Sequence, residues 1–219
     1  MPRKARSPVE IVARKRPAPP ESLFDGTSSQ RYVAAVDVSQ WVHEAFLVEG
    51  APLFNPGHKH LHFADIAYLW AAEQNTRKMR RVVGECEQVM FRDSGWQRGR
   101  KEQQFDEWFG RTPGFLITLD AEYARQCSDL EWCALVEHEL YHIGQRRDEY
   151  GQPEFTREGL PKLGMRGHDV EEFVGIVRRY GVGAGAGDTA MLVAAAARAP
   201  EIGGVSIAHA CGTCMLRAA

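Results

Sequence analysis

Two histidines and a glutamate in the stretch HELYH, residues 138–142, have the types and spacing best suited to chemistry. In an α-helix His138 and His142 lie about 40° apart, so both imidazole rings project from one face. Two imidazoles in that arrangement can each direct a nitrogen at one zinc ion about 2.0–2.1 Å away. Glu139 can reach a metal-bound water without binding the metal, which is the role of a general base. The stretch therefore predicts zinc-assisted hydrolysis.

The helix that carries this stretch is predicted to bury its opposite side. Apolar residues fall between about 120° and 200° from His138: Trp132, Val136, Leu140 and Ile143. Ser128 and Glu131 have the spacing of a capping box, so we expect the helix to begin at Ser128. The histidines thus avoid the apolar stripe of a capped amphipathic helix.

A catalytic zinc ion needs a third protein ligand and an open position for water. The downstream stretch GHDVEEF, residues 167–173, offers His168, with Glu171 and Glu172 as alternatives. All three lie opposite the apolar stripe of a helix that the spacing predicts over residues 168–180. We expect one of them to complete the site, and an acidic residue that does not bind zinc could orient a histidine.

Other histidines and cysteines give weaker patterns. His58, His60 and His62 have no acidic or cysteine partner beside them, so we interpret this stretch as a solvated helix entry. Cys211 and Cys214 form a CxxC pair, but no second pair of similar spacing completes a structural zinc site. Three roles for this pair remain open: packing in the core, half of a metal site, or thiol redox chemistry.

The elements around the HELYH helix follow from local patterns. In GFLITLD, residues 114–120, apolar residues alternate on one face, which predicts a strand at a sheet edge. Four further segments are predicted in the same way: a helix at 63–74, a strand at 80–91 with a bulge near Gly84, a loop at 93–104 and an Ala-rich helix at 189–199 after a Gly-rich connector.

Composition places the chain among soluble globular proteins. Of its 219 residues, 44% are hydrophobic and 26% are charged, and the net charge is −2. We expect a basic, proline-rich tail without a fold at 1–22, one main domain at 23–182, and a connector with a C-terminal helical extension that carries the CxxC pair at 183–219. The tail could contact nucleic acid weakly, but the remainder is acidic.

The expected location is the cytoplasm. No apolar run is long enough to span a bilayer, and none follows the basic residues as in a secretory signal. Five cysteines, an odd number, argue against a disulfide framework and favour a reducing compartment.

The HELYH helix, the later GHDVEEF stretch and the preceding GFLITLD strand resemble the phage metallopeptidase family and, more distantly, the SprT-like zinc peptidases, over roughly residues 60–182. The resemblance implies an α+β fold: a small zincin-like domain in which a twisted, mainly antiparallel or mixed sheet packs on the active-site helix, with a second ligand-bearing helix. It implies zinc ligands His138, His142 and His168 with Glu139 as base, a protein or peptide substrate whose backbone pairs with LITLD, and the host cytoplasm as location if a phage encodes the chain.

Two alternatives to a general peptidase remain. One is a non-catalytic binding protein that keeps the zincin shell, although zinc retention alone would not require Glu139. The other is a SprT-like protease that acts on DNA-associated proteins, for which only the basic tail gives support.

Overall fold

A computed structural model of the chain describes residues 7–13, 16–26, 29–77, 79–170, 177, 182, 187–205 and 211–213. The chain forms two compact units, one of residues 1–166 and 205–219 and the other of residues 167–204. Residues 205–219 therefore group with the first unit, whereas we had expected them in an extension that begins at residue 183. The domain boundaries predicted above otherwise stay predictions.

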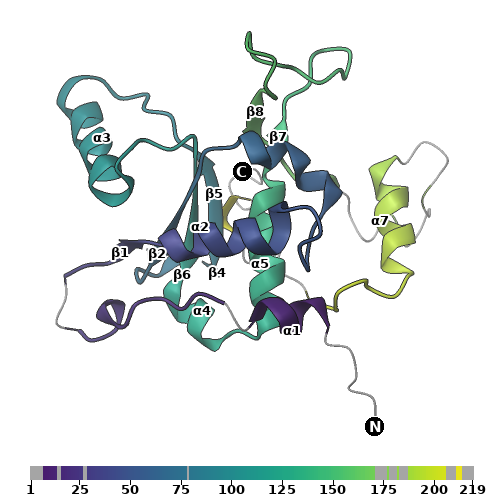
Figure 1. Cartoon of the computed structure of the whole chain (residues 1–219), viewed down its shortest axis with the longest axis horizontal. Helices are drawn as coiled ribbons and strands as arrows, with labels where there is room; N and C mark the ends of the chain where they lie inside the picture. Colours follow the sequence, from purple (N-terminus) through teal and green to yellow (C-terminus); the bar gives the residue numbers. More distant parts are fainter. Residues whose placement is uncertain are drawn as a thin grey trace. The chain divides into compact units, whose positions relative to one another are not determined.

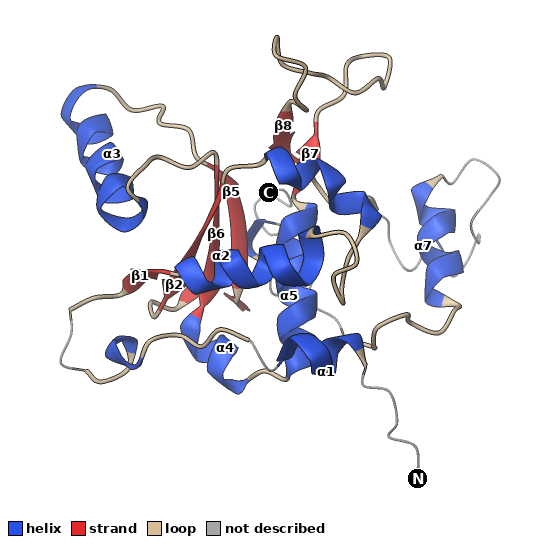
Figure 2. Cartoon of the chain, in the orientation of Figure 1, coloured by secondary structure: helices blue, strands red, loops and turns tan. Residues whose placement is uncertain are grey.

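A mixed four-stranded sheet forms the centre of the first unit (Figure 2). Its order is β1 (Tyr32–Ala34), β2 (Ile66–Ala71), β6 (Phe115–Asp120) and β5 (Gly84–Gln88). β6 pairs in parallel with β2 and antiparallel with β5, and β1 is antiparallel to β2. The predicted α+β class with a small mixed sheet is confirmed.

Helices cover both faces of this sheet (Figure 1). α2 (Val36–Val42) and α5 (Asp129–Tyr141) pack on one face, and α3 (Gly95–Phe109) packs on the other. Side chains of β6 alternate between the two, because successive residues of a strand point to opposite faces. Ile117 joins the large core with Trp132, while Leu116 joins a smaller cluster with Phe105. The stacked rings of Trp70 and Trp132, 5.5 Å apart, tie α5 to β2.

Shorter elements complete the first unit. Two-stranded sheets pair β3 (Asn75–Arg77) with β4 (Arg80–Val82), and β7 (Ile143–Gln145) with β8 (Leu163–Met165). The remaining helical elements are α1 (Pro8–Ala13), η1 (Glu21–Leu23), η2 (His43–Leu47), η3 (Pro56–Phe63) and α4 (Ala121–Gln126).

The N-terminal segment corrects one prediction. Residues 8–13 form α1, which packs on α5 and buries Val12 in the core, so the expectation of an unfolded tail is wrong for this part. The guanidinium of Arg16 donates to the carbonyl of Cys127 at 3.1 Å and lies over the ring of Trp132. Arg16 is thus engaged with the fold, whereas residues 1–6 lie outside the described part of the chain.

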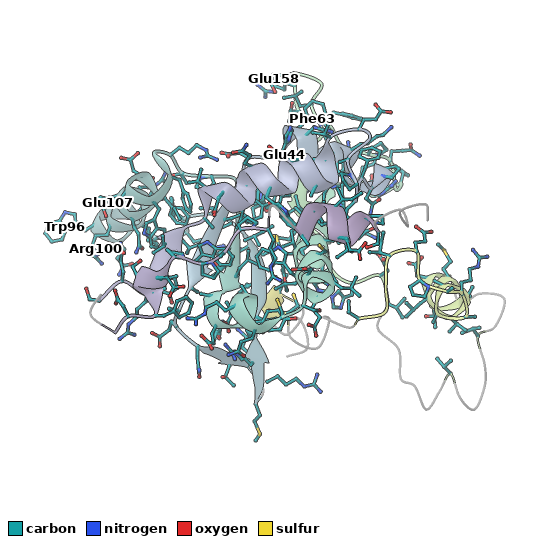
Figure 3. All side chains as sticks on the ribbon, turned by 60° about the horizontal axis from the view of Figure 1, so that its bottom comes forward. Glu44, Phe63, Trp96, Arg100, Glu107 and Glu158 are labelled. Carbon is teal, nitrogen blue, oxygen red and sulfur yellow. The ribbon has the colours of Figure 1, made fainter. Side chains whose placement is uncertain are left out.

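Two other local predictions are wrong. Residues 66–71, expected to be helical, form β2, because both faces of this strand are covered and its apolar residues run on without alternation. Residues 95–104, expected as loop, belong to α3, whose Phe105 and Trp108 pack on the sheet. Trp96, Arg100 and Glu107 project from the outer side of α3, and Trp96 is 88% exposed (Figure 3).

The position of β6 corrects a further prediction. β6 is hydrogen-bonded to β2 on one side and to β5 on the other, so it is not an edge strand. LITLD therefore has no free edge with which a substrate backbone could pair. The edge strand on this side is β5, and the irregularity predicted near Gly84 corresponds to the break at Val83 between β4 and β5.

The C-terminal third is described in part. Most of the helix predicted over 168–180 lies outside the described residues; of those that are described, 168–170 are not helical, whereas residue 177 is helical. α7 (Asp188–Ala196) in the second unit confirms the Ala-rich helix. In the part of the chain that the structure describes, no helix has the length and apolar character to cross a membrane.

Candidate metal centre

The local sequence of α5 sets the direction in which its functional side chains point. The hydroxyl of Ser128 accepts from the backbone N–H of Glu131 at 3.3 Å, and the Glu131 carboxylate accepts from the Ser128 N–H at 2.8 Å. This is the predicted capping box. The predicted apolar face is also confirmed for Trp132, Val136 and Leu140, which are 0% exposed. Ile143, expected on the same face, is buried but begins β7 after the helix has ended.

His138 and His142 come together on the side of α5 away from this apolar face. Their Nε2 atoms lie 3.3 Å apart, which is close to the roughly 3.3 Å separating two nitrogens bound at 2.0–2.1 Å to one tetrahedral zinc ion. Nδ1 of His142 lies 2.9 Å from the carbonyl oxygen of Arg166, to which it can only donate. That hydrogen bond assigns the proton to Nδ1 and leaves the Nε2 lone pair for a metal.

Glu139 is the most deeply buried acidic group of the site. Its side chain is 0% exposed, and neither carboxylate oxygen has a hydrogen-bond partner among the described residues. Burial, followed by the nearby Cys211 sulfur, raises the pKa of Glu139 well above its usual range. A buried carboxylate without a partner is costly, so the site is suited to receive a cation or a bound water.

Gly84 on β5 lets this carboxylate approach the sheet. A Cβ at position 84 would lie 2.7 Å from Cδ1 of Leu135 and 2.8 Å from Oε1 of Glu139. Both distances are shorter than van der Waals contact, so α5 can pack this closely only against glycine. The backbone of β5 thus forms one wall of the site.

A third group at this site comes from the C-terminal part of the first unit. The ligand atoms of His138, Glu139 and Cys211 all lie within 4.8 Å of one another, and Cys211 is 0% exposed. Its sulfur lies 3.3 Å from Nε2 of His142. We had left three roles open for Cys211, of which half of a metal site was one; the signal was its CxxC spacing from Cys214, which lies outside the described residues.

The pKa of His142 also reflects these neighbours. Burial lowers it, but the Cys211 thiol and the Arg166 carbonyl together raise it above its usual value in the metal-free chain. A metal bound at Nε2 requires the neutral ring, with its proton on Nδ1.

His168 lies in the second unit, and its role as third ligand stays a prediction. The two acidic alternatives, Glu171 and Glu172, lie outside the described residues. The residues of the first unit nevertheless fit a metal ion, because paired imidazole nitrogens, a thiol and a carboxylate without a partner converge at one point.

Comparison with known families agrees with this geometry. Residues 39–197 match the model of the family described as "Putative phage metallopeptidase". The match spans more than half of the chain, and the chain belongs to this family. The description indicates a metallopeptidase, and therefore a metal. No curated protein and no solved structure matches the chain. The relation to SprT-like peptidases stays a prediction.

Proposed function

We propose that the chain is a zinc-dependent peptidase in which His138 and His142 bind the metal and Glu139 is the general base. His168 is the proposed third ligand, with Glu171 or Glu172 as its replacement. The observation that carries the proposal is a fully buried carboxylate without a hydrogen-bond partner beside two imidazole nitrogens 3.3 Å apart.

Each group has a separate task in hydrolysis. Zinc, when bound, polarises the scissile carbonyl and lowers the pKa of a water. Glu139 takes the proton of the attacking water and delivers it to the leaving amine nitrogen. The Arg166 carbonyl holds the ring of His142 in place through Nδ1, so that Nε2 keeps its direction during the reaction.

The proposed substrate is a protein or peptide in the cytoplasm, or in the host cytoplasm if a phage encodes the chain. Arg16 is engaged with Cys127 and Asp129, so a weak nucleic-acid contact through the tail would depend on its other basic residues, Arg3, Lys4, Arg6, Arg14 and Lys15. Binding of DNA fragments at increasing salt concentration, with and without residues 1–6, tests this contact, since phosphate contacts weaken steeply with salt.

The replacement Glu139→Gln tests the base. It keeps the size of the side chain but removes proton transfer, so hydrolysis of labelled casein should fall at least about 100-fold. Bound zinc, measured by mass spectrometry of the purified protein, should stay at about one ion per chain. Glu137→Gln, on the same helix, is the matched control and should leave both quantities unchanged.

Retention of wild-type turnover by Glu139→Gln would contradict the assigned base. A wild-type chain that binds zinc but hydrolyses no peptide bond would instead support the non-catalytic alternative. A separate change, His168→Ala, tests the third ligand and should lower the zinc content sharply. Unchanged content would move that role to Glu171 or Glu172, which Gln substitutions would then test singly.

A further inference from the structure

Residues 211–213 lie along the outer edge of β5. Cys211 forms a parallel bridge with Gly84. The hydroxyl of Thr213 donates to the carbonyl oxygen of Cys86 and accepts from its N–H, both at 2.8 Å. The three residues therefore extend the sheet beside α5, where the HELYH histidines lie (Figure 1).

The middle residue of this segment is fixed by tight packing. A Cβ at Gly212 would lie 2.7 Å from Cγ1 of Val82 and 3.1 Å from Cβ of Glu85, so only glycine fits without a shift. The Gly212 carbonyl accepts from Nη1 of Arg77 at 2.8 Å. Contacts on both sides of the backbone thus hold Cys211 in one position.

We propose that Cys211 binds, as a thiolate, the same metal ion that His138 and His142 hold, as an alternative to His168 in the third protein position, so that one position stays open for water. This inference rests on the proposed function insofar as it requires a metal at these histidines. Its geometry is that of one coordination sphere. Bond lengths of 2.0–2.1 Å to nitrogen and about 2.3 Å to sulfur place a nitrogen and a sulfur about 3.5 Å apart on one tetrahedral ion. The sulfur of Cys211 lies 3.3 Å from Nε2 of His142.

The environment of the sulfur points to the same conclusion independently. Cys211 and Glu139 are both 0% exposed, and the carboxylate has no hydrogen-bond partner among the described residues. Two groups that become negative when ionised lie within 4.8 Å of each other and of a ring nitrogen of His138. A divalent cation among them compensates both charges, and a thiol that coordinates such an ion is deprotonated.

The competing explanation is a metal-free hydrogen bond between the Cys211 thiol and the His142 ring. That bond would satisfy the sulfur and one ring nitrogen. It would leave the Glu139 carboxylate buried without a hydrogen-bond partner, which is unfavourable for a charged group.

Cobalt substitution distinguishes the two explanations. The full chain is stripped of metal and reconstituted with Co²⁺, whose visible bands report metal binding and whose near-ultraviolet charge-transfer band reports a thiolate ligand. The wild-type chain should show both signals. Cys211→Ala should lose the charge-transfer band while a visible spectrum remains, and Cys127→Ala, a matched control at a half-buried cysteine, should keep both.

Zinc affinity gives a second measurement. Loss of a group that merely orients a ligand typically lowers metal affinity 10–100-fold. In competition with a chelator, Cys211→Ala, which removes a ligand, should lower zinc affinity by at least as much. The zinc affinity of Cys211→Ser should lie between those of the wild-type chain and of Cys211→Ala. Circular dichroism of each variant verifies that it is folded. If Cys211→Ala is not folded, Cys211→Ser takes its place in both measurements.

The outcomes of the cobalt experiment can be distinguished from the outcomes that test the proposed function. Visible cobalt bands without a charge-transfer band in the wild type would overturn the thiolate ligand and leave the peptidase proposal to the Glu139→Gln test. A charge-transfer band that persists in the folded Cys211→Ala variant would also overturn it. No cobalt binding at all would overturn both proposals.

Discussion

Two pairs of histidines four residues apart, His138/His142 and His58/His62, have different surroundings. In the first pair His138 lies in α5 and His142 caps its C-terminus, and their Nε2 atoms are 3.3 Å apart. The second lies in the 3₁₀-helix η3, where His58 is 1% exposed and His62 is exposed. Our interpretation of residues 58–62 as a solvated helix entry is therefore wrong for His58.

Helix geometry explains the difference. An α-helix turns about 100° per residue, which puts residues four apart about 40° from each other. A 3₁₀-helix turns about 120°, which puts them about 120° apart, on different sides. His58 packs against the ring of Tyr141 at 4.5 Å, while His62 lies near the ring of His43. The same spacing thus brings two ring nitrogens together in one helix type and keeps them apart in the other.

The largest expected effect separates the two pairs directly. His138→Ala removes a proposed metal ligand and should reduce bound zinc far below one ion per chain, with loss of peptide hydrolysis. His62→Ala is the matched control and should leave the zinc content unchanged. Mass spectrometry of both proteins measures the zinc content. Equal zinc content in the two variants would contradict the inference that the two histidine pairs differ in metal binding.

A second change alters the sheet wall beside the metal site and leaves the histidines in place. Gly84→Ala puts a Cβ 2.7 Å from Leu135, so it should lower the free energy of unfolding by about 1–3 kcal/mol, as overpacking does. Gly99→Ala, in α3 with open space around it, should be neutral or stabilising by up to about 1 kcal/mol. Urea denaturation measures both, and equal stabilities would mean that α5 can move away from β5.

A third change tests whether the buried histidine of η3 serves packing alone. His58→Ala should lower the free energy of unfolding by about 1–2 kcal/mol, because it empties a buried space against Tyr141, without changing the zinc content. His62→Ala should change stability by less than about 0.5 kcal/mol. Loss of zinc in His58→Ala would show that the two regions are coupled.

The smallest effect concerns the start of the helix that carries the first pair. Ser128→Ala removes the cap of α5 and should lower the free energy of unfolding by about 1 kcal/mol. Zinc affinity should remain, since packing against the sheet, and not the cap, holds the histidine face. Thermal denaturation with and without zinc measures both quantities. A large fall in zinc affinity would mean that the cap at Ser128, and not packing against the sheet, orients the histidine face.

Local features were predictable from the sequence because they depend on neighbours along the chain. The cap at Ser128 and the two faces of α5 are of this kind. The strand β2 was not predicted because it is buried on both sides, so its residues do not alternate. The helix α3 was not predicted because the glycines at 95 and 99 are typical of a loop. In both cases tertiary packing determines the structure. The central position of β6 and the approach of Cys211 to His142 depend on pairings between distant segments, which local spacing cannot supply.

The segment at 211–213 has a consequence for solubility. An exposed edge strand offers unpaired N–H and C=O groups to other chains and promotes aggregation. Thr213 occupies both backbone groups of Cys86 on this edge. A chain truncated after residue 204 should therefore self-associate through β5, which light scattering at increasing protein concentration would detect.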